Sequence, residues 1–201
     1  MRKNQVSTGE ETQRTALQFF NNLLKKMRRK FQISEKASLF RKMKQDNGIT
    51  VENLTIKDVI LILLFARPER KIIGRLMFVK ETFLLTNRYF QNVFSELSYF
   101  PSHYGPYSVV LINSIENLSK EGLINIEQTG NQYGTTTYYF SLTDVGKIVA
   151  YESFEKLPVL MKETVITKRT AWDRMGYSGI LRLVYSEYPE YTSASKIADK
   201  V

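Results

Sequence analysis

Lysine and arginine side chains are the residues whose number and spacing suggest a chemical role, and that role is binding phosphate. They number 29 against 20 aspartates and glutamates, which gives a net charge of +9. The excess is local, because residues 1–50 hold 12 basic and 4 acidic residues while residues 51–201 hold 17 and 16. Such a basic segment favours a polyanionic partner. We expect its phosphate contacts to come from Lys25, Lys26, Arg28, Arg29, Lys30, Arg41 and Lys42.

A second set of candidate residues lies in the middle of the chain. The stretch 67–88 is basic, and we expect Arg70, Lys71 and Arg75 to hold a DNA backbone. In the helix expected to follow residue 106, polar side chains could read base edges. These are Ser108, Asn113 and Asn117. One lysine beside two acids on that helix, and a following loop without cations, count against specific reading, because base contacts rely on phosphate anchoring.

Catalytic and metal-binding residue types are nearly missing. The chain has no cysteine and one histidine, His103, for which spacing suggests no catalytic partner. No phosphate-binding glycine loop or dinucleotide fingerprint occurs. We therefore predict a protein that is not an enzyme and that uses neither a metal nor a cofactor. The longest apolar run, Val59–Ala66, is shorter than the roughly twenty residues that span a bilayer, so we expect a cytoplasmic protein. Its basic charge, if it binds DNA, predicts association with the nucleoid.

The basic segment has the pattern of a helical arm. An apolar stripe at spacings of three and four indicates one helix, and a second short helix is expected over 34–47. The stripe consists of Leu17, Phe20, Leu24, Met27 and Phe31. Three interpretations remain open: a basic face on nucleic acid, a helix docked on the body or on its twin, and attachment to a membrane surface.

The remaining residues predict the order helix, helix, strand, helix, β-ribbon, helix, which is that of a winged helix-turn-helix. Thr55 and Asp58 form a capping-box pattern before a buried helix, and a second helix that includes Ile72 should follow Pro68. Later elements are a strand within 94–105, a helix from Pro106 to Gly122, strands over 123–128 and 136–142, and helices over 144–157, 178–188 and 195–201. The apolar stripe in 180–188 and the stripe of the arm predict a homodimer through one or both of them. The alternative for the segment 180–188 is a helix that packs back on the core.

Several motifs resemble those of YwgA-type winged-helix proteins of prokaryotes, with a more distant similarity to Panacea-type antitoxin domains. The motifs are 103–108 (HYGPYS), 120–124 (KEGLI), 139–146 (YFSLTDVG), 70–78 (RKIIGRLMF), 180–190 (ILRLVYSEYPE) and 195–197 (SKI). The resemblance implies a regulatory or interaction role and no catalytic residue. The expected organisation is a mainly α (α+β) chain with a basic helical arm over 1–50, a winged-helix domain over 51–160 and a C-terminal helical extension over 161–201.

These observations predict a non-enzymatic protein that binds double-stranded DNA, as a transcriptional regulator or chromosome-associated factor. In that interpretation the arm contacts phosphates and the winged helix docks on the duplex. The alternative is a protein-interaction module, antitoxin-like or an adaptor, in which the winged helix is a scaffold for a protein partner. A third interpretation is binding to RNA, to the ribosome or to a membrane surface.

Overall fold

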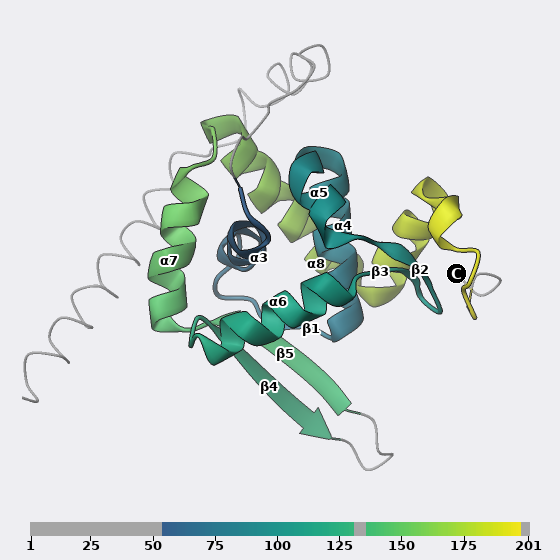
Figure 1. Ribbon diagram of the computed structural model, residues 1–201, viewed down its shortest axis with the longest axis horizontal. Coiled ribbons are helices and arrows are strands. Elements are labelled where there is room, and N and C mark those ends of the chain that lie inside the picture. Colours follow the sequence, from purple (N-terminus) through teal and green to yellow (C-terminus); the bar gives the residue numbers. More distant parts are fainter. Residues whose placement is uncertain (1–53, 131–135, 198–201) are drawn as a thin grey trace, which may run out of the picture. The chain divides into compact units, whose positions relative to one another are not determined.

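The computed structural model describes residues 54–130 and 136–197 (Figure 1). The chain divides into two compact units, Met1–Ile49 and Thr50–Val201, and every element below belongs to the second unit. The arm and both of its expected helices lie outside the described residues.

The described residues are mainly helical and carry a small antiparallel sheet, which confirms the mainly α (α+β) class. The helices are α3 (Ile56–Phe65), α4 (Arg75–Tyr89), α5 (Gln91–Leu97), α6 (Val109–Lys120), α7 (Asp144–Glu155), α8 (Val159–Glu187) and the 3-10 helix η1 (Pro189–Tyr191). The strands are β1 (Ile72–Ile73), β2 (Phe100–Ser102), β3 (Gly105–Tyr107), β4 (Ile124–Gly130) and β5 (Thr136–Leu142). One sheet has the strand order β1-β5-β4, and β2 pairs with β3.

Helix α3 lies among the other helices, with α7, α6 and α4 around it (Figure 1). The predicted capping box is confirmed, because the Thr55 hydroxyl accepts from the Asp58 amide and the Asp58 carboxylate accepts from the Thr55 amide. The same carboxylate accepts hydrogen bonds from Ser153 and Lys156 and so ties α3 to α7. Burial alone would raise the pKa of Asp58, but these hydrogen bonds lower it to about 2.

Helix α4 begins three residues later than the sequence pattern suggested. Ile72 and Ile73, assigned to this helix from their spacing, form β1 and pair with Phe140 and Tyr139 of β5. Gly74 follows with φ of 90°, a backbone conformation that interrupts a helix and suits glycine. The prediction of a helix through Ile72 is therefore wrong, because pairing with a strand distant in sequence overrides the local apolar spacing.

The stretch between α4 and α6 also differs from the prediction. Phe94 belongs to α5, and Ser98, which follows this helix, lies in the left-handed region (φ 48°). The expected single strand is a hairpin of β2 and β3. Pro106 was expected to open the next helix but lies in β3, opposite Pro101. The helix starts at Val109 instead, because the Ser108 side chain caps it by accepting from the Leu111 amide.

The ribbon and α7 follow the prediction closely. Strand β5 has the expected bounds, and Thr143 caps α7 by accepting from the Gly146 amide at 2.9 Å. Gly146 is required by close packing, since a Cβ there would lie 1.9 Å from the backbone oxygen of Leu123. The start of α7 is thus fixed against the residue that precedes β4.

Helix α8 is longer than the apolar segment 178–188 from which a helix was predicted. It runs from Val159 to Glu187, with a break at Gly176 (φ 63°, ψ −171°). The boundary drawn between residues 160 and 161 falls inside this helix, and α8 packs on α4 within the same compact unit. Residues 195–197, expected to open a last helix, are not helical, and residues 198–201 lie outside the described part.

Candidate functional site

Helix α6 holds the residues predicted to read bases. It buries Leu111, Ile115 and Leu118 against the core, and this pattern leaves Asn113 and Asn117 exposed one turn apart. Both asparagines are therefore accessible, as the prediction requires. Ser108 is not: it is fully buried, caps α6 and donates to the Leu97 carbonyl, so its assignment as a base-reading residue is wrong.

The body cations predicted to hold phosphates are all exposed, but two of the three are paired with glutamates. The Nζ of Lys71 lies 2.7 Å from the carboxylate of Glu127 on β4. The guanidinium of Arg75 lies 3.9 Å from Glu116 of α6 and 4.1 Å from the ring centroid of Tyr138. Arg70 makes no ion pair with a described residue. That all three anchor DNA stays a prediction, and their surroundings are more acidic than the basic sequence suggested.

Lys57 and Glu121 form a third exposed ion pair between a lysine or arginine and a glutamate. The Lys57 Nζ lies 2.7 Å from the carboxylate of Glu121 at the end of α6. Exposed pairs of this kind contribute only about 0–1 kcal/mol, so each cation could exchange its glutamate for a phosphate. The glutamates would then remain beside the DNA and repel it. Along α6 and β4 the described surface therefore has little net positive charge to offer a duplex.

Apolar side chains lie exposed at the amino end of α6. Val109 is 52% exposed and Val110 38%, and the hairpin that leads directly into this helix exposes Phe100 (42%) and Tyr104 (40%). We call Val109, Val110, Asn113, Glu116 and Asn117, the exposed residues of α6 before its last turn, the α6 face. A neutral surface with exposed apolar groups suits contact with a protein better than contact with phosphates.

The other predicted binding residues belong to the arm. Lys25, Lys26, Arg28, Arg29, Lys30, Arg41 and Lys42 lie outside the described residues, as does the ribbon tip at 131–135. The apolar stripe in 180–188, offered as a dimer surface, is largely used within the same chain, because Ile180, Leu181 and Val184 are buried. A homodimer through this stripe would need a different set of residues.

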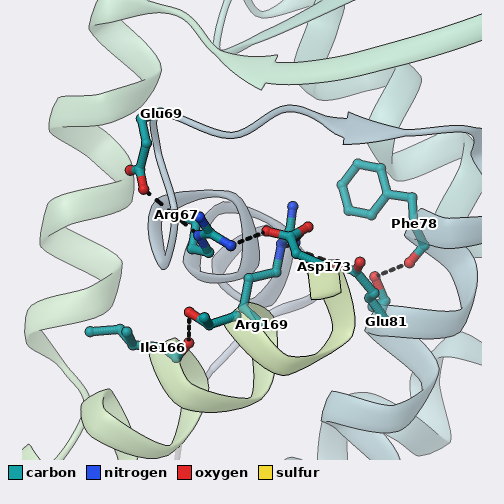
Figure 2. A network of polar contacts seen from close by, with 9 residues as sticks. Arg67, Glu69, Phe78, Glu81, Ile166, Arg169 and Asp173 are labelled. Atoms are coloured by element: carbon teal, nitrogen blue, oxygen red, sulfur yellow. Dashed lines mark hydrogen bonds and ion pairs between the residues drawn. The ribbon is translucent and has the colours of Figure 1, made fainter. Parts of the chain in front are cut away.

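A buried polar network connects α4, α8 and the segment after α3 (Figure 2). Arg169 of α8 is fully buried, with its Nε 3.1 Å from Oε2 of Glu81 on α4, and it also contacts Asp173. Asp173 accepts a hydrogen bond of 2.7 Å from Arg67. Neither carboxylate oxygen of Glu81 receives a well-aligned hydrogen bond from a described residue. Burial therefore raises the pKa of Glu81 to about 8, with Arg169 acting against this shift and Asp173 adding to it.

Lys80, the neighbour of Glu81, points to the other side of α4. Its Nζ donates to the Pro106 carbonyl at 2.7 Å, which ties the β2–β3 hairpin to the core. Burial lowers the pKa of this amine to about 7. Sequence reasoning missed both residues; the available signal was a Lys-Glu pair inside 76–85, a helical stretch with apolar residues on every side.

Lys80 should make the stability of the fold depend on pH. The unfolded amine titrates near 10.5 and the folded amine near 7, so between these values unfolding takes up a proton and stability rises with pH. We expect the free energy of unfolding of the parent to rise relative to Lys80→Met by up to about 1.4 kcal/mol per pH unit from pH 7 to 10. Urea unfolding at several pH values measures this difference. A constant difference across that range would contradict the assignment, and Lys120→Met, changed at an exposed lysine, is the matched control.

His103 lies exposed at the turn of the β2–β3 hairpin, where its backbone carbonyl accepts from the Lys196 amide. In the part of the chain that the structure describes, no group of three or more metal-ligating side chains is close enough to hold an ion. No helix among residues 54–130 and 136–197 has both the length and the apolar character needed to cross a membrane. Comparison with protein-family models and with curated proteins finds no match for this chain.

Proposed function

We propose that this chain is a non-enzymatic binding protein and that its folded body is a winged helix used to contact another protein. The topology supports the winged helix: a three-helix core of α3, α4 and α6 is followed by the ribbon β4–β5, with β1 added beside β5. Helix α5 and the β2–β3 hairpin are an insertion before α6, which takes the recognition-helix position. The resemblance to YwgA-type proteins agrees with this proposal and remains a prediction.

The observation that carries the protein-binding role is the pairing of Lys57, Lys71 and Arg75 with glutamates along α6 and β4. A recognition helix that docks in a major groove needs cations free for the phosphates on either side. Here Lys57, Lys71 and Arg75 are matched by acids, which leaves Arg70 and Lys120 as exposed cations without an ion pair to a described residue. The α6 face adds exposed apolar side chains. The α6 face supplies shape and apolar contact, which are the features of a protein interface.

Asparagine substitutions on α6 test this role against base reading. We expect Asn113→Ala and Asn117→Ala in the full chain to leave DNA affinity and sequence preference unchanged. If these residues read bases, each change should instead cost about 1–3 kcal/mol of discrimination. Selection from random duplexes by the parent and by both variants measures the preference.

A second measurement identifies what touches the α6 face in cells. A photo-reactive residue at position 113 or 117 should form adducts with protein, whereas the same residue at exposed position 152 on α7 should not. Nucleic-acid adducts from positions 113 and 117 would overturn the proposal and restore DNA reading by α6.

DNA binding remains the second candidate function, and the observation that favours it is the +8 balance of residues 1–50. In this form of the proposal the arm supplies nearly all of the affinity, without sequence preference, while the body recruits a protein. The chain would then act as a chromosome-associated factor or as an adaptor for one.

A further inference from the structure

The carboxyl-terminal half of α8 carries a surface groove that the α6 face does not include. It has a volume of about 430 Å³ and is lined by Met175, Gly179, Arg182, Leu183, Tyr185 and Ser186. The break at Gly176 lies directly after Met175. A Cβ at Gly179 would lie only 2.8 Å from the Cβ of Met175. The absence of a side chain at Gly179 therefore leaves space beside the exposed side chain of Met175. We call this feature the α8 groove.

Two arginines lie at or next to the α8 groove, because Arg182 lines it and Arg174 directly precedes the lining residue Met175. Arg174 and Arg182 are both exposed, and neither makes an ion pair or a side-chain hydrogen bond with a residue that the structure describes. In contrast, Arg67, Arg88 and Arg169 are each paired with an acid. Glu187, the acid near the end of α8, forms an ion pair with Arg88 and not with the two arginines at the groove. The apolar groove therefore lies beside two cations without counter-charges.

An apolar groove beside two arginines that form no ion pair with a described residue restricts the class of ligand that can bind there. A second copy of the α8 groove seated on the first would bring its own arginines against Arg174 and Arg182, and such like-charge contacts are unfavourable. A nucleic acid would use the arginines but gain nothing from Met175 and Leu183. An amphipathic helix with carboxylates beside its apolar stripe would use both features.

We propose that the α8 groove binds an acidic amphipathic helix of a partner protein. Apolar side chains of that helix, spaced i, i+4 and i+7, would cover Met175, Gly179 and Leu183. Its flanking carboxylates would pair with Arg174 and Arg182. The α8 groove and the α6 face share no residue, so the proposal stands whether or not the α6 face binds a protein.

The test is selection of helical peptides by the full chain. The probe is a displayed library of peptides of about 16 residues, roughly four helical turns, with randomised surface positions. The parent should select peptides in which aspartate or glutamate flanks an apolar i, i+4, i+7 stripe. The double variant Arg174→Glu with Arg182→Glu should select lysine and arginine at the same positions. A synthetic acidic peptide from the parent selection should bind the double variant at least about tenfold more weakly in fluorescence anisotropy.

Matched variants show whether the effect belongs to this groove. Met175→Glu should weaken the acidic peptide by about tenfold, while Val145→Glu, the same kind of change at an exposed apolar position of α7, should not. Lys120→Glu, on exposed α6, controls for general electrostatic attraction. Identical selections by the parent and the double variant, or no peptide enriched by the parent, would overturn the proposal. So would a double variant that loses affinity for a short DNA duplex and keeps the peptide.

Discussion

At a pH above 8, the approximate value to which burial raises the pKa of Glu81, replacing Arg169 by methionine should lower the free energy of unfolding by about 3–5 kcal/mol, the usual cost of removing one partner from a buried ion pair. Arg169 is fully buried, and the change would leave Glu81 without a cation and Asp173 with Arg67 alone. Chemical denaturation of the full chain, followed by the fluorescence of its single tryptophan, measures the loss. That tryptophan, Trp172, is buried on the same helix.

A second substitution separates lost charge pairing from lost volume. Glu81→Met added to Arg169→Met removes both charges and should recover most of the stability, because apolar residues of similar size often replace buried ion pairs at little cost. Arg174→Met, at an exposed position of α8, should change the free energy of unfolding by less than about 0.5 kcal/mol. A loss below about 1 kcal/mol for Arg169→Met would mean that the network does not hold α8 on α4. Arg169→Lys keeps the positive charge, so its free energy of unfolding should lie between those of the parent and of Arg169→Met.

The elements predicted correctly from the sequence are those whose signals are local. The capping box at Thr55, the ribbon strand Thr136–Leu142 and the cap at Thr143 each depend on residues within a few positions of one another. Helix α6 was placed by its buried stripe, although its start was put too early because Pro106 fits the first turn of a helix equally well. A prediction from such a local pattern holds in the folded chain when no segment distant in sequence imposes a different structure on the same residues.

The errors arise where a distant segment determines the outcome. Ile72 and Ile73 have helical spacing but pair with β5, which lies more than sixty residues further along the chain. Lys80 and Glu81 look like solvated charges until α8 and the β2–β3 hairpin cover α4 from two sides. The pairing of Lys71 and Arg75 with glutamates is likewise a property of the folded surface. Charge counts along the sequence predicted a polyanionic partner but could not show which cations of the folded body are paired with acids.

Neutralising the cluster Lys25, Lys26, Arg28, Arg29 and Lys30 to glutamine should weaken DNA binding across all sequences. Each phosphate contact contributes about 0.9 to the slope of log K against log salt concentration on duplex DNA, so the five-residue variant should lose up to about 4.5 from that slope. Titration of a labelled duplex over a salt series measures it. We expect this variant to lose more DNA affinity than any of the other variants, because residues 1–50 carry +8 of the +9 net charge.

The matched control removes the same charge from the body. Arg70, Lys120, Arg174, Arg182 and Lys196 are exposed and make no ion pair with a described residue, so changing all five to glutamine lowers the net charge equally. If the arm anchors DNA, this control keeps most of the parent's salt slope, because only cations that contact phosphate release counterions. Equal losses in both variants would mean that affinity follows total charge and not the arm. A loss confined to the body variant would instead place the DNA contacts on the folded unit, against the protein-binding role proposed for its α6 face.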